Sequence, residues 1–214
     1  MEEPDRKHGE WAAEPSAQAA LLRAVARVAA TGGYAAATPA NLAGEARVPE
    51  EAFWHHFDSV EQCYLMMYDC VVRRLKKEVD RAVGDCRDDP TAWQQQLDAG
   101  FGAVLRFLAA RPLLARACVL EVTAAGDRAR ERRDIALRHF TDRLEVLRRA
   151  HGGSVPPLAP EMIVRGTYGL IQVRVARGET EQLERLLPDL RYVWLVPFGG
   201  RHRASVWARK EGDA

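Results

Sequence analysis

Three breaks between residues 16 and 57 constrain this chain most, because each one ends a helical stretch or begins the next. Ser16 precedes apolar residues at helical spacing, and Gly32-Gly33 ends that stretch because glycine tolerates the left-handed conformation common at helix ends. Thr38-Pro39 joins an N-cap hydroxyl to a proline at the first helical position. Pro49 fits the start of a further helix after a turn. The pattern predicts short helices over about 16–30, from Thr38 to about 46, and over 49–57.

Apolar side chains within these stretches predict that the three helices pack on one another. They recur on one face of each stretch, as Leu21, Ala24, Val25 and Val28, then Leu42, Ala43 and Ala46, then Phe53 and Phe57. Three short helices in this order are a helix-turn-helix candidate. Ser59 and Gln62 match a capping box, in which the serine hydroxyl serves the amide of Gln62 and the glutamine reaches back to the amide of Ser59. A longer helix is therefore expected from Ser59 to about Val83.

The rest of the chain alternates helical patterns with helix breakers. Prolines or glycines occur at 90, 112, 126, 152–153, 156–157, 160, 178, 188, 197 and 199–200, and the intervals between them are mostly apolar at helical spacing. No hairpin signal and no repeated period is present. The sequence predicts an all-α protein, with a three-helix N-terminal unit followed by a larger helical bundle.

Composition narrows the classes of function. The chain has 214 residues, of which 47% are hydrophobic and 29% charged, and no apolar run is long enough for a membrane span. Its four cysteines lack metal-ligand spacing and suit a reducing cytoplasm. Residues 1–15 are acidic and lack the apolar core of a signal peptide, so we expect a disordered tail. The net charge of +1 gives no general basic surface for nucleic acid, so any DNA-binding role must rest on a motif.

The segment from Leu21 to about Leu65 resembles the DNA-binding segment of the TetR family of transcription regulators. The matching residues are Gly33-Tyr34, Thr38, Leu42-Ala43, Ala46, Val48, Phe53-Trp54, His56-Phe57, Ser59 and Glu61, and weaker agreement continues at 111–114, 121, 187–190 and 196–199. The resemblance implies a DNA-binding helix-turn-helix domain at 16–58. It also implies a ligand-binding and dimerisation domain at 59–200, which leaves a C-terminal tail at 201–214.

The resemblance also implies roles for individual residues. In that family the third helix enters the major groove, and side chains at the positions of Thr38, Trp54 and His56 contact backbone phosphates. Residues 50, 51, 52 and 55 then become the groove-facing candidates, namely Glu50, Glu51, Ala52 and His55. The alternative for Trp54 and His56 is that both side chains are partly buried and serve packing alone, without contacting DNA.

Three positions depart from the family pattern. Arg47 stands where the turn usually has glycine, Pro49 where it has serine, and Val60 where a lysine meets phosphate. Between residues 16 and 57, three arginines are balanced by three glutamates. Arg47 can compensate as a phosphate contact, but we expect DNA binding that is weaker or more narrowly specific than is usual in the family.

A small-molecule pocket is a further implication of the resemblance. The candidate ligand-binding residues are Met67, Trp93, Phe101, Phe107, Cys118, Glu121 and Tyr168, and core packing is the alternative for most of them. Glu121 is a lone carboxylate in an apolar run, where it would pair with a cationic ligand or, in the simpler interpretation, with an arginine. No metal motif, phosphate loop or nucleophile–base pair is present, so we expect no cofactor and no enzymatic activity.

Apolar faces on the stretches 127–150 and 160–177 predict a homodimer. They carry Ile135, Phe140, Leu144 and Leu147, then Met162, Ile163, Tyr168, Leu170 and Ile171. The resulting hypothesis is a cytoplasmic repressor that binds a double-stranded operator and is released by an unidentified small molecule. The alternative is a dimeric ligand- or protein-binding module of the same fold whose third helix no longer reads DNA. An all-helical enzyme ranks last.

Overall fold

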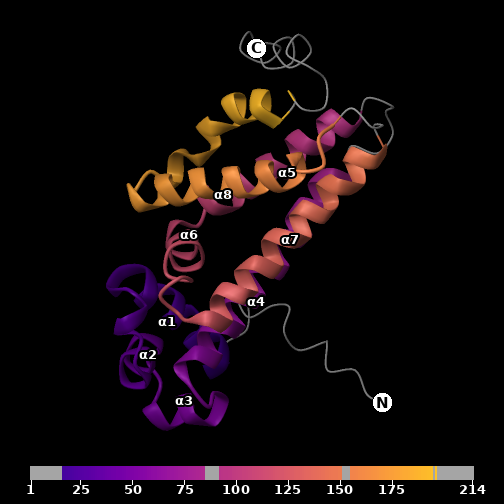
Figure 1. The fold of residues 1–214 in the computed structure, drawn as a ribbon. Helices are drawn as coiled ribbons and strands as arrows, with labels where there is room; N and C mark the ends of the chain where they lie inside the picture. The colour runs from indigo at the N-terminus through magenta and orange to yellow at the C-terminus, as the bar shows by residue number, and fades with distance from the viewer. Residues whose placement is uncertain (1–15, 85–91, 151–154, 195, 197–214) are drawn as a thin grey trace, which may run out of the picture. The chain divides into compact units, whose positions relative to one another are not determined.

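The computed structural model describes residues 16–84, 92–150, 155–194 and 196, and these ranges hold helices, turns and no β-strand. The expected all-α fold is therefore confirmed over the described residues. The helices, labelled in Figure 1, are α1 (Ala17–Gly32), α2 (Pro39–Ala46), α3 (Glu50–His56), α4 (Val60–Gly84), α5 (Ala92–Ala109), α6 (Pro112–Val119), α7 (Asp127–Ala150) and α8 (Ala159–Ala176). Two 3₁₀ helices are η1 (Tyr34–Ala36) and η2 (Thr180–Leu186), and residues 187–194 are again α-helical.

Local capping explains where the first helices begin. Ser16 Oγ accepts the N–H of Ala19 at 3.2 Å at the start of α1. The proline at the head of α3 has extended backbone, so it caps that helix from outside instead of forming its first residue. At the start of α4, Ser59 Oγ accepts the N–H of Gln62 at 3.1 Å, as expected. The Gln62 side chain, however, accepts the N–H of Asp58 and not that of Ser59, so this half of the capping-box prediction was wrong by one residue.

The contacts divide the chain into two compact units. Of the described residues, unit 1 comprises 16–76 and 111–133, and unit 2 comprises 77–84, 92–110, 134–150, 155–194 and 196. Helices α4 and α7 each supply residues to both units. The expected functional boundary between residues 58 and 59 stays a prediction, and the expected tails at 1–15 and 201–214 lie outside the described residues.

Unit 1 has its core between α1, the helix-turn-helix and the first part of α4. Figure 1 shows α1, α2 and α3 gathered together. The largest side chains that they bury with α4 are almost fully shielded from solvent: Leu21, Leu42, Phe53, Phe57, Tyr64 and Met67. Ion pairs from Arg128 to Glu61 and from Arg132 to Asp69 join the first part of α7 to α4. The hydrophobic core thus holds α1, α2 and α3 against the first part of α4.

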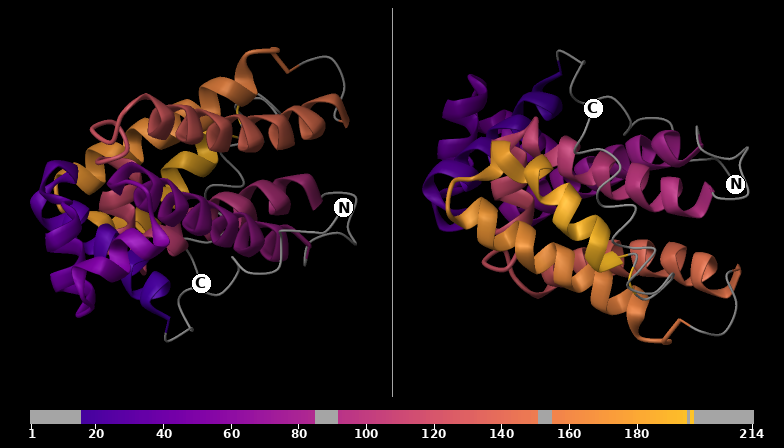
Figure 2. Two further views of the ribbon diagram at one scale, coloured as in Figure 1. Left: turned by 90° about the horizontal axis from the view of Figure 1, so that it is seen from below. Right: turned by 90° about the horizontal axis from the view of Figure 1, so that it is seen from above.

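Unit 2 is held together around Trp194. Its ring stacks on Phe101 of α5 with centroids 3.9 Å apart, and its indole N–H donates to Thr167 Oγ1 of α8 at 3.0 Å. One turn earlier, Arg191 forms a two-pronged ion pair with Asp98 of α5, with N–O distances of 2.6 and 2.8 Å. Figure 2 shows the corresponding segment, in yellow, running beside α8. These contacts tie the last described helical segment to both α5 and α8.

The described cysteines, Cys63, Cys70 and Cys118, form no disulfide. Burial raises the pKa of the Cys63 and Cys118 thiols to about 12. Within the described ranges, no helix combines the length and apolar character needed to cross a lipid bilayer.

Candidate nucleic-acid interface

Helix α2 begins with a side chain that stays accessible. Thr38 Oγ1 accepts the N–H of Asn41 at 3.2 Å, while the residue itself is exposed. The Asn41 side chain in turn donates to the carbonyl of Ala36 at 2.8 Å, which holds the preceding turn against the helix. Because the threonine oxygen only accepts in this cap, its O–H is left to donate to an outside acceptor such as a phosphate oxygen.

The turn between α2 and α3 places Arg47 in the left-handed region. Its φ and ψ are 57° and 44°, and within the described residues it is the one non-glycine residue with positive φ. The N–H of Val48 donates to the carbonyl of Ala43 at 3.1 Å, the long-range bond of a Schellman turn. The structure therefore explains why glycine is usual here: the arginine adopts a conformation that costs any side chain with a Cβ.

Helix α3 presents most of its surface to solvent. Phe53 alone is buried in this helix, and it anchors the exposed Trp54, whose ring meets it edge-on at 5.2 Å between centroids. Trp54 is 54% exposed, so the interpretation of this side chain as inert core does not apply. The other candidates Glu50, Glu51, His55 and His56 are exposed, and Ala52 is half-buried.

The two glutamates have a structural role in α3 of their own. Pro49 offers no side-chain cap, and Glu50 and Glu51 occupy the first turn, where negative charge interacts favourably with the free N–H groups of a helix. The same two carboxylates repel DNA phosphates. Negative charge that stabilises the start of α3 would thus oppose DNA binding at the same turn.

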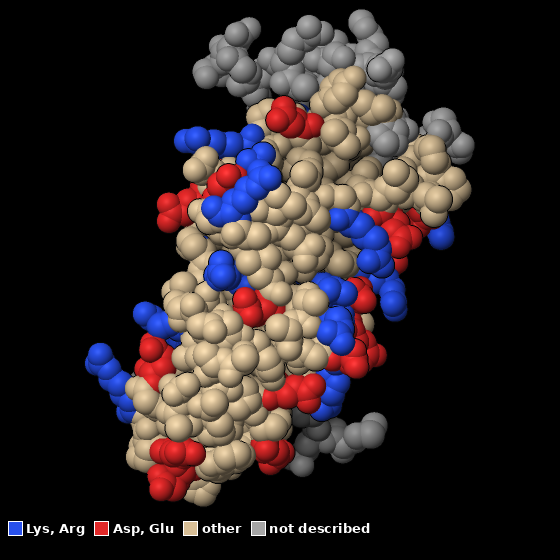
Figure 3. Space-filling model, turned by 60° about the vertical axis from the view of Figure 1, so that its left-hand side comes forward, with Lys and Arg blue, Asp and Glu red and all other residues tan. Residues whose placement is uncertain are grey.

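Basic charge near the two helices is limited. Arg27 of α1 is paired with Glu45 of α2 at 3.0 Å, which leaves Arg47 as the arginine of the α2–α3 turn without an ion pair in the described part of the chain. On the face of the molecule in Figure 3, the lowest charged side chains, at the level of α2 and α3 in Figure 1, are acidic. On this face, the surface at that level therefore offers acidic instead of basic side chains.

The candidate ligand-binding residues fall in both units. In unit 1, Met67 and Cys118 are buried with their sulfur atoms 3.9 Å apart. In unit 2, Phe101 stacks on Trp194, Phe107 is 1% exposed, and Trp93 and Tyr168 are half-buried. Met67 and Cys118 are thus in contact with each other. A ligand role for all seven residues stays a prediction.

Glu121 has a partner that the sequence did not indicate. We expected an arginine, but its Oε2 accepts the backbone N–H of Tyr34 at 2.9 Å. Sequence reasoning also missed Tyr64, whose hydroxyl donates to the carbonyl of Ala117 at 2.7 Å. No local pattern could have revealed either bond, because the partners lie 87 and 53 residues apart.

A metal centre finds no support at these positions. Across the part of the chain that the structure describes, no three His, Cys, Asp or Glu side chains lie together in a way that could hold a metal ion. The candidate interface residues, from Thr38 to His56, all belong to unit 1.

Comparison with known proteins gives a result at the level of the fold. No protein-family model matches the chain, and neither does any curated protein sequence. Among solved structures, the fatty acid degradation regulator FadR from Bacillus halodurans aligns with a TM-score of 0.71 at 18% identity, covering 87% of this chain and 97% of its own. This chain has a TetR-like fold.

Two further structures agree with that assignment. FadR from Bacillus subtilis, determined in complex with stearoyl-CoA, aligns with a TM-score of 0.66 at 17% identity over 85% of this chain and 97% of its own. A TetR-family transcription regulator from Shewanella sp. PV-4 also gives 0.66, at 18% identity, over 86% of this chain and 96% of its own. The TetR-like fold therefore extends over most of the chain, beyond the first 65 residues in which the sequence resemblance is strongest.

Proposed function

We propose that the protein is a cytoplasmic, homodimeric transcription regulator that binds double-stranded operator DNA and is released from it by a small molecule. The observation that carries the proposal is the exposed surface shared by α2, the Arg47 turn and α3, on a TetR-like fold whose structural neighbours are regulators. Thr38, Arg47, Trp54 and His56 are proposed to contact phosphates. Glu50, Glu51, Ala52 and His55 are proposed to face the base edges of the major groove.

A homodimer is supported by apolar side chains that unit 2 leaves exposed. On α8, Met162, Leu170 and Val173 are 70, 44 and 46% exposed, and a Cβ built on Gly166 or Gly169 would meet no atom within 4 Å. Small residues beside exposed apolar ones let a second helix approach closely. A two-fold dimer would place its two α3 helices, one from each protomer, about 34–36 Å apart, which is one turn of B-DNA.

The effector is proposed to act by population shift. A small molecule that binds one position of α4 better than another shifts the population toward that position. The two α3 helices of the dimer then no longer match the spacing of the operator half-sites, and operator affinity falls. Because one structural neighbour was determined with stearoyl-CoA, long-chain acyl-CoA thioesters are the first effector class that we would test.

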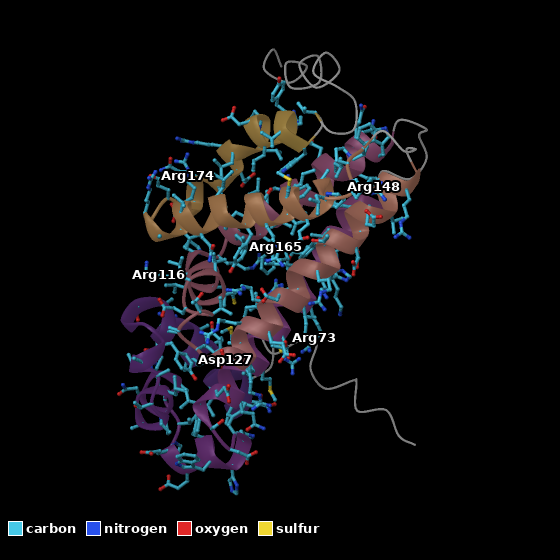
Figure 4. The ribbon with its side chains drawn as sticks, in the orientation of Figure 1. Arg73, Arg116, Asp127, Arg148, Arg165 and Arg174 are labelled. Atoms are coloured by element: carbon cyan, nitrogen blue, oxygen red, sulfur yellow. The ribbon has the colours of Figure 1, made fainter. Side chains whose placement is uncertain are left out.

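The test is an unbiased selection of genomic DNA fragments by the purified protein, followed by titration of the selected site. We expect Trp54→Ala and Arg47→Ala each to weaken binding about tenfold, in line with the loss of one good contact. Arg116→Ala is the matched control, because this exposed arginine lies on α6, apart from α3 in Figure 4. Selection of no fragment at any low salt concentration would refute the proposal.

A second candidate function is favoured by the neutral charge of the interface. If Glu50, Glu51 and the Arg27–Glu45 pair leave too little positive potential for DNA, the same dimer would act as a ligand- or protein-binding module. In that case the selection recovers no DNA while acyl-CoA or another small molecule still raises the thermal midpoint of unfolding.

A further inference from the structure

A single carboxylate, that of Glu121, connects the turn after α6 to the segment that leads into α2. Glu121 Oε2 accepts the N–H of Tyr34, and Gly33 beside it has a φ of 81°. This positive-φ, extended conformation, with a ψ of 161°, is readily adopted by glycine and turns the chain out of α1 so that the amide of Tyr34 meets the carboxylate. The backbone that carries Glu121 is itself held in place, because the Glu121 carbonyl accepts the N–H groups of Ala124 and Ala125 at 3.0 Å.

A second contact links Tyr34 to α6 indirectly, through Tyr64 of α4. The ring of Tyr34 meets the ring of Tyr64 edge-on, with centroids 5.2 Å apart. Tyr64 is fully buried on α4, and its hydroxyl donates to the carbonyl of Ala117 on α6. Tyr34 is therefore held through its backbone by the turn after α6 and through its side chain by a tyrosine that is itself bonded to α6.

From Tyr34 to the start of α2 the backbone has little freedom. Ala37 donates to the carbonyl of Tyr34 at 3.0 Å, and Thr38 donates to the carbonyl of Ala36 at 3.0 Å. Asn41, the third residue of α2, donates its side-chain N–H to the same Ala36 carbonyl. A shift of the Tyr34 amide would therefore reach the N-terminus of α2 through these local hydrogen bonds.

We infer that Glu121 is a positioning residue for the DNA-reading helices: its carboxylate fixes the start of α2 relative to the turn after α6. The inference rests on the proposed function for its DNA readout. It assigns Glu121 to regulation of the interface instead of to direct contact with an effector. Any effector that displaces the segment after α6 would act on α2 through this bond.

The experiment compares Glu121→Ala, Glu121→Gln and the wild-type protein at a temperature where all three are fully folded by circular dichroism. Glutamine keeps an acceptor oxygen at the same position, whereas alanine removes it. We expect Glu121→Ala to lower operator affinity about tenfold and Glu121→Gln to stay within about threefold of wild type. Glu131→Ala, an exposed carboxylate of the same unit, is the control and should leave affinity unchanged.

Amide hydrogen exchange, measured on the same samples without DNA, separates the two proposals. Glu121→Ala should speed exchange at Tyr34 and across the first turn of α2, and Glu121→Gln should restore protection. A purely structural role would lower the thermal midpoint while the folded Glu121→Ala protein bound its operator like wild type, and that result overturns the inference. If the wild-type protein binds no DNA, the proposed function fails, and unchanged exchange in α2 would then overturn the inference separately.

Discussion

At the scale of single residues, Arg47 adopts a backbone conformation that is unfavourable for a residue with a Cβ. The Schellman turn requires a left-handed residue at this position, and glycine adopts that conformation without steric cost. The chain has instead a cation that belongs to no ion pair in the described structure, next to a helix that starts with two glutamates. The strain is understandable if the guanidinium group serves a phosphate.

Replacement of Arg47 by glycine should therefore separate stability from DNA binding. We expect Arg47→Gly to raise the free energy of unfolding by about 0.5–1 kcal/mol, because the left-handed strain is relieved. The same change should weaken operator binding and reduce the slope of log K against log salt by about one. Urea unfolding and titrations at several salt concentrations measure the two effects. A variant that is both more stable and equally tight on DNA would show that Arg47 has no role at the interface.

At the scale of elements, the segment 187–194 is attached to α5 by a largely buried ion pair. Arg191 is 5% exposed, and its guanidinium group donates hydrogen bonds to both carboxylate oxygens of Asp98. Removing one partner leaves a poorly solvated charge, whereas removing both together leaves none. By contrast, the ion pair between Arg174 and Glu179 has side chains 41 and 31% exposed, so water screens it.

We accordingly expect Arg191→Met to lower the free energy of unfolding by about 3 kcal/mol. The double change Asp98→Leu with Arg191→Met should recover part of that loss. Arg174→Met, the control at an exposed pair that Figure 4 labels, should cost less than about 1 kcal/mol. Chemical denaturation of the four proteins provides the comparison, and equal losses at Arg191 and Arg174 would contradict the role of burial.

Buried thiols on α4 and α6 make the stability of unit 1 sensitive to alkaline pH. Burial holds the pKa of Cys63 and Cys118 at about 12, above the ordinary value of 9.0, so both thiols stay protonated in the folded state. Above about pH 9 the unfolded chain loses these protons and the folded chain does not, which favours unfolding. The contribution is complete below about pH 9 and is lost progressively as pH rises toward about 12.

The expected loss is up to about 1.4 kcal/mol per pH unit for each thiol. Urea unfolding between about pH 8 and about pH 10.5 measures it, with the Cys63→Ala and Cys118→Ala double variant as the reference that lacks both groups. The double variant should be less stable near neutral pH but should lose less stability on alkalinisation. Parallel pH profiles for the two proteins would exclude the thiols as the cause.

At the scale of the whole molecule, the proposed dimer would allow two α3 helices to bind one operator together. The sequence marked α7 and α8 as apolar, but the structure buries Leu144, Ile163 and Ile171 within unit 2. The side chains that remain exposed on α8 are Met162, Leu170 and Val173. These side chains, together with Ile135 and Val146, which stay exposed on α7, can meet another copy without unfolding the monomer.

Leu170→Glu should therefore convert the dimer to a monomer and lower operator affinity by at least about 100-fold, because one half-site must then bind alone. Sedimentation velocity and a DNA titration give the two readouts. Leu113→Glu is the control, since Leu113 is similarly exposed, at 41%, but lies on α6 in unit 1. A Leu170→Glu protein that stays dimeric would place the interface elsewhere.

Local signals explain why so much of the fold could be predicted from the sequence. A cap or a breaker acts within one helical turn, so Ser16, Thr38 and Ser59 marked helix starts that the structure confirms. The spacing of Phe53 and Phe57 likewise indicated the buried side of α3 and its end. The sequence by itself thus determined the helical class and these helix starts, whereas the structure decided that Trp54 and His56 are exposed.

Tertiary structure alone decided which distant groups meet. The partner of Glu121 is a backbone amide 87 residues away, and Arg191 finds Asp98 across 93 residues. Such pairs depend on how complete helices pack, and any accessible arginine or amide would have satisfied the local sequence equally well. The left-handed φ of Arg47 is likewise a property of the closed turn. Hydrogen bonding and burial across the chain, not local propensity, therefore assign these residues to their roles.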